Sequence, residues 1–320
     1  MRHYKKLEVP NQPQVFLQWK EENIGAINNW IEDDSKKPSI IWDELGQTFN
    51  IHRETQIESV SVRNDLLNSL FSEQHGLCCY CGNNIKRELD NNGNWKYKEY
   101  AIEHFKAKNS NRTLIFDYNN LMLCCKESTK CVKYEVGRNG INSFEDVATS
   151  ANLDVEIIKN FKSNRGLARK EQLEVTDTIK IPNPEHCDDS KSKFDSQEDE
   201  TIIINPTSED DIQKIESLKY IGNGEIIHNS TSEADIKVIE NSIKVLSLNC
   251  DTLKDFRKKK YDAALDNFNT IVQTLNEDAD VIKSSVIKLI AGKSIPDDEG
   301  ILEPFYFVEI DFLKNILKNS

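Results

Sequence analysis

The stretch "GLCCYCG", residues 76–82, places Cys78 and Cys81 with two residues between them and Gly82 directly after the second thiol. Two thiolates at this spacing on a tight turn can hold one side of a tetrahedral Zn²⁺ and leave two ligands to come from elsewhere. A pair of buried thiols and a redox C-x-x-C are the alternatives. Because more cysteines follow downstream, we expect zinc.

The residues on either side of this stretch predict a helix before it and short strands after it. In "ESVSVRNDLLNSLFSEQHG", residues 58–76, apolar side chains recur at Val62, Leu66 and Leu70, and the pattern ends at Gly76. This four-residue spacing is typical of an amphipathic helix. Downstream, short alternating runs interrupted by "NNGN", residues 91–94, predict a hairpin or two short strands.

The composition favours a folded protein that keeps its thiols reduced. Hydrophobic residues make up 38% and charged residues 30% of the 320 positions, which is enough to bury a core in one or two domains. No apolar run is long enough to cross a bilayer, so we expect a cytoplasmic protein. Six of the eight cysteines lie in "CCYC" and "CCKESTKC", and in a reducing compartment they are more naturally metal ligands than disulfides.

The net charge of −13 argues against tight unaided binding to nucleic acid, because contacts to phosphate supply most of that affinity. The basic run "RKKK" at residues 257–260 is expected on a solvated helix face, with contact to phosphate as the alternative. Any polyanion would therefore have to be bound locally or with the help of a partner.

The pattern along the chain divides it into three regions. Residues 1–55 read as an N-terminal arm that packs on the body or on another protein. Residues 56–200 hold the cysteine-rich core, with an insertion at about 132–182. Residues 201–320 begin with a strand, "TIIINP" at 201–206, and a hairpin, "KYIGNGEII" at 219–227, and continue as helices. The fold class expected is α+β.

An adjacent acid and imidazole lie between the two cysteine clusters. Glu103 and His104 end an apolar stretch, and Asn120 precedes "LMLCC". Hydrolysis of a phosphodiester needs an oxygen ligand for a hard cation and an imidazole that can deprotonate water near neutral pH. Asn120 could hold the local loop or orient the histidine. Each residue alone has a structural explanation, and it is their order between the clusters that indicates a site.

This order resembles HNH endonucleases of the Cys-zinc type, which have a ββα-metal fold. In that family a C-x-x-C pair precedes an Asp-His or Glu-His pair on the first strand, then Asn-Leu, then a third cysteine five residues after the Asn. A fourth cysteine is followed directly by a metal-binding residue on the helix. The matching residues here are Cys78, Cys81, Glu103, His104, Asn120, Leu121 and Cys125.

The fourth cysteine has two candidates. Cys131 is nearer, but Val132 follows it and cannot bind a cation. In "HCDDSK", residues 186–191, Cys187 is followed by Asp188, an oxygen ligand suited to Mg²⁺, and then by Lys191. The resemblance implies that Cys187 is the fourth zinc ligand after an excursion through residues 132–182, with Cys131 as the alternative. It also implies a contact between Lys191 and phosphate.

More narrowly, the chain is similar to the HNH subunit of Septu antiphage systems, the PtuB family, which also accompanies some retrons. The similarity covers residues 65–130 and 183–260 and includes "IEHFKAKN" and "YIGNGEI". It implies a zinc-stapled ββα nucleus and a partner ATPase of the ABC type, PtuA, which would supply the surface for nucleic acid. It implies no membrane association.

The same similarity implies a division of work between two metals. Zinc on four thiolates is structural, while Mg²⁺ or a similar divalent cation on Glu103 and Asp188 assists hydrolysis, with His104 as general base. DNA is preferred to RNA as the substrate. The alternatives are a nuclease that cleaves RNA such as tRNA, and a non-catalytic zinc-binding module that docks in the same complex.

Overall fold

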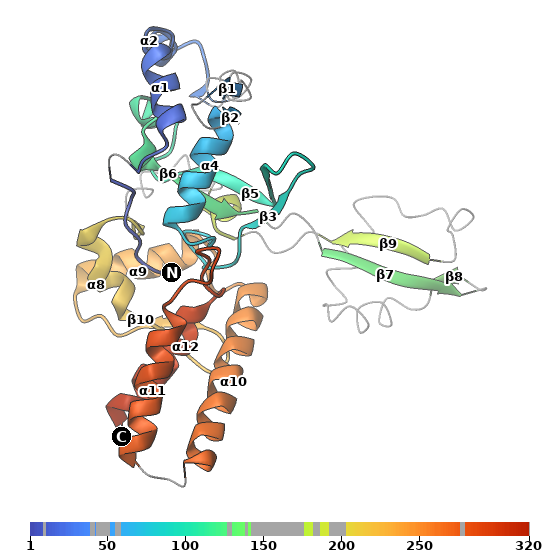
Figure 1. The fold of residues 1–320 in the computed structure, drawn as a ribbon, viewed down its shortest axis with the longest axis vertical. Coiled ribbons are helices and arrows are strands. Elements are labelled where there is room, and N and C mark those ends of the chain that lie inside the picture. The colour runs from blue at the N-terminus through green and yellow to red at the C-terminus, as the bar shows by residue number, and fades with distance from the viewer. Residues whose placement is uncertain are drawn as a thin grey trace. The chain divides into compact units, whose positions relative to one another are not determined.

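The computed structural model of the chain has a mixed architecture of helices and short antiparallel sheets, which confirms the expected α+β class (Figure 1). It describes residues 1–8, 11–38, 42, 52–54, 59–126, 130–137, 140–141, 176–181, 186–191, 203–275 and 279–319. The chain forms two compact units, one of Met1–Lys126 with His186–Ser320 and one of Glu127–Glu185. The predicted insertion at about 132–182 falls within the second unit.

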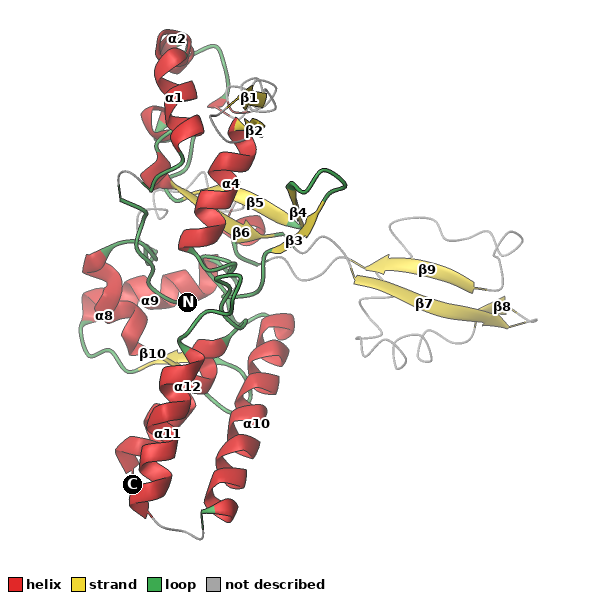
Figure 2. Ribbon diagram, viewed as in Figure 1, coloured by secondary structure: helices red, strands yellow, loops and turns green. Residues whose placement is uncertain are grey.

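The second unit contains an antiparallel sheet in the order β8-β7-β9. Its strands are β7 (Lys130–Gly137), β8 (Gly140–Ile141) and β9 (Thr176–Ile181), drawn as arrows in Figure 2. Cys131 lies on β7 in register with Lys180 of β9. The alternative fourth zinc ligand is therefore part of this sheet.

The N-terminal residues pack against the rest of the first unit. Helices α1 (Gln14–Glu22) and α2 (Ile24–Glu32) bury Phe16, Trp19 and Ile27, and α1 contacts helix α4. The carboxylate of Asp65 accepts the backbone N–H of Phe16 at 3.0 Å. Further along, β1 (His52–Glu54) pairs with β2 (Ser59–Ser61). The rest of the predicted arm at 1–55 lies in part outside the described residues.

The helix predicted before the C-x-x-C stretch is confirmed as α4 (Val62–Glu73). It begins where the Ser61 hydroxyl accepts the N–H of Asn64 at 3.1 Å, which satisfies one of the free N–H groups of its first turn. The apolar residues that gave the pattern are buried along one side, together with Phe71. This side forms the support for the cysteine-rich turn that follows.

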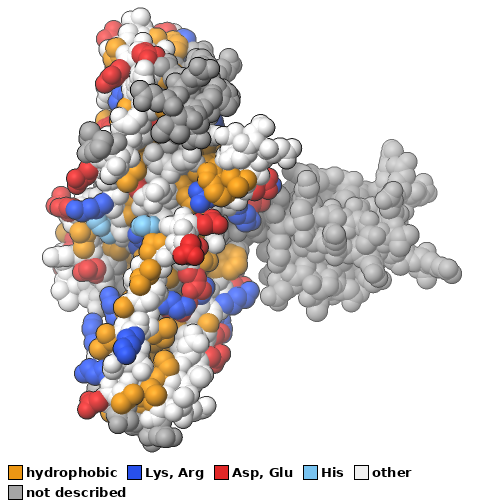
Figure 3. Space-filling model, viewed as in Figure 1, with side chains coloured by type: hydrophobic (Ala, Val, Ile, Leu, Met, Phe, Trp, Pro, Cys, Tyr) orange, Lys and Arg blue, Asp and Glu red, His pale blue; other side chains and the backbone are white. Residues whose placement is uncertain are grey.

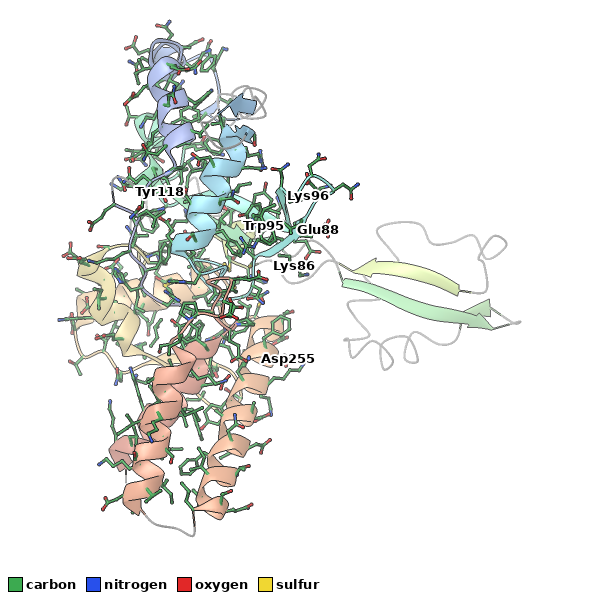
Figure 4. All side chains as sticks on the ribbon, viewed as in Figure 1. Lys86, Glu88, Trp95, Lys96, Tyr118 and Asp255 are labelled. Atoms are coloured by element: carbon green, nitrogen blue, oxygen red, sulfur yellow. The ribbon has the colours of Figure 1, made fainter. Side chains whose placement is uncertain are left out.

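A buried charge network at the end of α4 fixes the first residues of the chain. The carboxylate of Glu73 accepts from the Lys6 amine at 2.6 Å, from the Leu7 N–H at 3.2 Å and from the Tyr118 hydroxyl at 2.7 Å. Figure 4 labels Tyr118, which lies just before strand β6. Since a buried carboxylate needs such partners, this network joins three distant segments around one acid.

A β-hairpin follows the cysteine-rich turn, as predicted. Strands β3 (Lys86–Leu89) and β4 (Trp95–Lys98) are antiparallel, and Gly93 takes a positive φ of 80° in the turn between them. The Arg87 guanidinium lies between the rings of Phe71 and Trp95, 3.9 and 3.8 Å from their centroids. This contact ties the hairpin to α4. Figure 4 shows Lys86, Glu88 and Lys96 on the same hairpin.

The next two strands and a short helix carry most of the predicted site. Strand β5 (Tyr100–His104) pairs antiparallel with β6 (Leu121–Cys125), and His104 is opposite Leu121 while Tyr100 is opposite Cys125. The 3₁₀ turns η1 (Arg112–Leu114) and η2 (Tyr118–Asn120) lie in the connection between them. The single-turn helix α7 (Asp188–Lys191) follows after the second unit.

The predicted strand at 201–206 is wrong for residues 203–206, and its first two residues lie outside the described range. Ile203 and Ile204 are buried, as their apolar character requires, but side chains bind the backbone instead of a neighbouring strand. The N–H of Ile204 donates to the Ser242 hydroxyl at 2.8 Å, and that of Asn205 donates to the Asp211 carboxylate at 2.7 Å.

The predicted hairpin at 219–227 is confirmed. After η4 (Glu209–Asp211) and α8 (Ile212–Ser217), strands β10 (Leu218–Tyr220) and β11 (Ile226–His228) pair around a turn in which Gly224 has a φ of 81°. A Cβ on Gly224 would lie 1.9 Å from the carbonyl oxygen of Lys254. Glycine is required there both by the backbone and by the neighbour.

The C-terminal region is helical, with α9 (Glu233–Val245), α10 (Asp251–Thr274), α11 (Ala279–Lys293) and α12 (Tyr306–Asn319). Helices α10, α11 and α12 contact one another around Ala264, Val286, Phe312 and Leu313. Figure 3 shows apolar side chains interspersed with charged ones on the visible face of these helices. Among the described helices, none is both long enough and apolar enough to cross a membrane.

The basic run at 257–260 is used within the fold. Arg257 is buried and donates to the carbonyl oxygens of Gly224 at 2.6 Å and Leu248 at 2.7 Å. Lys258 pairs with Asp262 at 2.6 Å, and Lys260 pairs with Glu303. The expectation of a solvated face is wrong for Arg257, because the hairpin turn packs over its guanidinium.

Candidate metal centre and adjoining carboxylate site

The C-x-x-C stretch forms a closed turn. The N–H of Cys78 donates to the Asn83 carbonyl at 2.7 Å, and the N–H of Gly82 returns to the Cys78 carbonyl at 3.1 Å. Gly82 has a φ of 76°, and a Cβ there would lie 2.3 Å from the ring of Phe307. The glycine after the second thiol is therefore needed to close the turn that presents both sulfurs.

The side chain of Gln74 fixes this turn beside β6. Its amide nitrogen donates to the carbonyls of Leu77 and Leu123, both at 2.8 Å, and its amide oxygen accepts the N–H of Leu123 at 2.7 Å. The N–H of Cys79 also donates to the Leu123 carbonyl at 3.0 Å. The turn is thus held next to Cys124 and Cys125. Nothing in the sequence around Gln74 signals this role.

Cys187 returns to the same place because its segment is fastened to the end of α9. Its N–H donates to the Leu246 carbonyl at 2.9 Å, and the Ser190 hydroxyl donates to the Val245 carbonyl at 2.8 Å. Cys187 has a φ of 57°, in the left-handed region that non-glycine residues seldom adopt. The sequence placed this cysteine near Cys125, and the structure brings the two together.

Two of the sulfur–sulfur distances among the four predicted zinc ligands are those of a tetrahedral site, although Cys78 and Cys81 belong to different donor groups. The Sγ of Cys78 lies 3.8 Å from that of Cys187, and the Sγ of Cys81 lies 3.6 Å from that of Cys125. Four sulfurs bound to zinc at about 2.3 Å in a tetrahedron would lie about 3.8 Å apart. All four predicted zinc ligands, Cys78, Cys81, Cys125 and Cys187, are buried. The cluster could therefore hold a metal ion such as zinc.

The donors exceed the four expected. Two overlapping groups have ligand atoms within 4.8 Å of one another, and Cys125 and Cys187 belong to both. The first group is completed by Cys78 and Cys124, and the second by Cys81 and His186. The Nδ1 of His186 lies 3.2 Å from the sulfur of Cys187. Cys124 and His186 are thus additional candidate ligands.

His104 is held in one tautomer at the end of β5. Its Nε2 lies 3.0 Å from the Ile115 carbonyl oxygen, which can only accept a hydrogen bond, so Nε2 carries the proton and Nδ1 carries the lone pair. The ring is buried, and the edge of the Trp42 ring contacts it. Burial, with a smaller contribution from Lys108, lowers the pKa of His104 to about 4. The imidazole is therefore neutral at pH 7 and can accept a proton.

Asn120 holds the connection that carries Ile115. Its amide oxygen accepts the N–H of Lys106 at 2.8 Å, and its amide nitrogen donates to the carbonyls of Lys106 at 3.1 Å and Leu114 at 3.2 Å. The two roles considered for Asn120, holding the loop and orienting the histidine, are thus linked. By fixing Leu114, it positions the carbonyl of the next residue that binds His104.

The carboxyl groups of Glu103 on β5 and Asp188 on α7 lie close enough for each to shift the pKa of the other. Burial, and then the charge of Glu103, raise the pKa of Asp188 to about 10. Burial alone would raise the pKa of Glu103, but the Lys191 ammonium and its hydrogen bonds hold it below the usual value. Each acid therefore shifts the pKa of the other, at a place where two oxygen donors could hold a hard divalent cation.

Two further side chains contact Glu103. The Lys191 amine lies 2.5 Å from its Oε1, and the Tyr80 hydroxyl donates to the same oxygen at 2.8 Å. Lys191 is buried, so its amine points into the protein. Tyr80 lies between the two cysteines of the C-x-x-C turn, and the sequence analysis did not single it out. An aromatic residue in such a turn carries no pattern that would reveal a carboxylate partner.

The predicted site residues therefore fall into two adjoining groups, the cysteine cluster and the carboxylate pair with Lys191. His104 and Asn120 both hydrogen-bond to backbone groups in the connection between β5 and β6. Neither a family model nor a curated protein matches this chain.

Proposed function

We propose that the chain is a metal-dependent HNH endonuclease whose zinc is structural and whose catalytic cation is held by Glu103 and Asp188. The observation that carries the proposal is that both acids adjoin the cysteine cluster: the Tyr80 hydroxyl donates to Glu103 at 2.8 Å, and the N–H of Asp188 donates to the Cys124 sulfur at 3.4 Å. The order of the elements supports the proposal, since β5 with Glu-His and β6 with Cys125 precede α7 with Asp188, with the strands of the second unit between β6 and α7.

The mechanism follows from the groups around the two acids. A divalent cation would supply positive charge for the scissile phosphate and its leaving oxygen. His104 takes a proton from water at Nδ1, because Nε2 is committed to the Ile115 carbonyl. Asn120 keeps that carbonyl in place. Four thiolates around zinc leave no open position for substrate, so the zinc centre acts only as a frame.

The net charge of −13 supports a partner that brings the nucleic acid. An ABC-type ATPase of the PtuA kind would fill this role in an antiphage defence complex, as the resemblance implies. DNA is the preferred substrate. RNA, including tRNA, remains the alternative, because no described contact reads a 2′-hydroxyl or a base edge.

The test is to incubate the purified chain, with and without the ATPase encoded beside it, with plasmid and with tRNA in Mg²⁺ and in EDTA. We expect cleavage in Mg²⁺ that His104→Ala abolishes while zinc content and circular dichroism stay unchanged. His75→Asn serves as the matched control, because its imidazole contacts only the distant Gly300 carbonyl among described bonds. Full activity of His104→Ala would refute the mechanism, and no strand breaks with wild type under any condition would favour a docking module.

A further inference from the structure

The Lys191 amine is fully engaged inside the protein. An ammonium has three N–H donors, and three oxygens receive them here: Oε1 of Glu103 at 2.5 Å and the carbonyls of His104 and Phe105, both at 2.9 Å. The side chain is 3% exposed. The three acceptors belong to consecutive residues at the end of β5. Lys191 therefore fixes the end of β5, which carries Glu103 and His104.

Asp188 and Lys191 approach Glu103 from the same short helix. They are three residues apart, so both side chains lie on one face of α7. Lys191 bonds to Oε1 of Glu103, and Asp188 lies close enough to the same carboxyl group for each acid to shift the pKa of the other. A single helical turn is not stable alone, so these bonds and those to α9 fix its position. The distance between the two acids is thereby set from both sides.

Tyr80 contacts Glu103 from the turn that carries Cys78 and Cys81. Its hydroxyl donates to Oε1 of Glu103 at 2.8 Å, and the side chain is fully buried. A carboxylate oxygen has two lone-pair positions, and Lys191 and Tyr80 occupy both on Oε1. Oε2 is then the oxygen that Glu103 can offer to a cation. The turn that presents Cys78 and Cys81 thus also orients the acid.

We propose that Lys191 is a positioning residue, which acts with Tyr80 to turn Glu103 so that it binds the divalent cation through Oε2 alone, next to Asp188. This inference rests on the proposed function, and it gives Lys191 a role different from contact with phosphate. It also makes the cysteine-rich turn a direct support of the carboxylate site.

A positioning role and a role as countercharge predict opposite effects of replacing Lys191 on the affinity for the cation. If the ammonium only neutralises the two acids, Lys191→Met should tighten cation binding, because a competing positive charge is gone. If Lys191 positions Glu103, the same change should weaken binding, since loss of a residue that orients a metal ligand costs about 10- to 100-fold in affinity. Tyr80→Phe removes a neutral donor, so only positioning predicts an effect there.

The experiment titrates Mn²⁺ into the zinc-loaded full chain at pH 7.5, without nucleic acid, and follows binding by electron paramagnetic resonance. Glu103→Gln identifies the site, and zinc content and circular dichroism report folding. Tyr97→Phe is the matched control, because it removes a tyrosine hydroxyl that bonds to Asn68 at 2.7 Å away from the acids. We expect binding at least about 10-fold weaker in Tyr80→Phe and Lys191→Met, and unchanged in Tyr97→Phe.

Tighter binding in Lys191→Met with unchanged binding in Tyr80→Phe would overturn the inference. Tyr80→Phe, which keeps the charge and the packing, decides the matter if Lys191→Met does not fold. Absence of a Glu103-dependent Mn²⁺ site in wild type would overturn both this inference and the metal-dependent part of the proposed function. The expected Mn²⁺ affinities without any nuclease activity would support positioning and refute only the nuclease.

Discussion

Replacement of Cys187 by serine should prevent the cysteine cluster from holding the proposed zinc ion. Cys187 belongs to both groups of metal donors, and its sulfur lies 3.8 Å from that of Cys78, the spacing of a zinc tetrahedron. Structural zinc contributes about 10–16 kcal/mol to folding, whereas a whole domain is stable by about 5–15 kcal/mol. The loss therefore matches the total stability, and we expect the first unit to be largely unfolded at 25 °C.

The assay is the zinc content of each purified variant by plasma mass spectrometry, with urea unfolding followed by circular dichroism. Cys125→Ser should behave like Cys187→Ser, because Cys125 is also common to both groups. Cys124→Ser and His186→Ala should keep zinc, since neither residue is in the predicted ligand set of Cys78, Cys81, Cys125 and Cys187. The stoichiometry also shows whether the six donors hold one ion or two.

Two controls separate Cys187 from the other candidates. Cys250→Ser removes a partly exposed thiol that is in neither donor group and should keep both zinc and stability. Cys131→Ser removes the alternative ligand, which lies on β7 of the second unit. The reasoning is refuted if Cys187→Ser retains its zinc while Cys131→Ser loses it.

Three further predictions concern stability. The pKa of His104, lowered from 6.5 to about 4, means that the unfolded chain binds more protons between these values, so stability falls on acidification. Wild type should lose about 2 kcal/mol more than His104→Gln between pH 7.5 and pH 5 in urea titrations; equal losses would contradict the burial argument. Gly224→Ala should lower the free energy of unfolding by about 3 kcal/mol or more, because its Cβ would meet the Lys254 carbonyl. Gly25→Ala, in open space on a helix, should raise it by about 1 kcal/mol. Thermal melts that rank the two variants otherwise would refute this. Arg257→Met should lower the urea midpoint by the equivalent of about 2–4 kcal/mol, since two buried carbonyl acceptors and the partly buried Asn249 amide oxygen lose a donor. An unchanged midpoint would show that water replaces the guanidinium.

Local patterns predicted the parts of the fold that local forces determine. The period of Val62, Leu66 and Leu70 indicated α4, and the Gly-Asn-Gly turn indicated the β10–β11 hairpin, because helix faces and turns depend on neighbours in sequence. The C-x-x-C spacing indicated a metal half-site for a similar reason.

Long-range partners had no such signal. Gln74 and Tyr80 are essential to the geometry of the site, yet each acts on a residue more than twenty positions away. Apolar composition at 203–206 gave burial correctly but strand wrongly, because Ser242, far along the chain, takes the backbone hydrogen bond. Arg257 shows the same effect in a charged run. Sequence patterns indicate which positions are apolar and buried. They do not indicate which distant polar side chain will hydrogen-bond to the backbone at those positions.

Cys125 and His186 meet although they lie 61 residues apart in the sequence, so a metal ion bound by the cluster would close a long loop. Closing a loop of that length costs about 2 kcal/mol more than closing one of about five residues, because the entropy grows with the logarithm of length. A variant in which this loop is shortened to a few residues would therefore bind the ion more tightly. None of the described donors of the two groups lies inside this loop, so a change of its sequence would remove no ligand from the cluster.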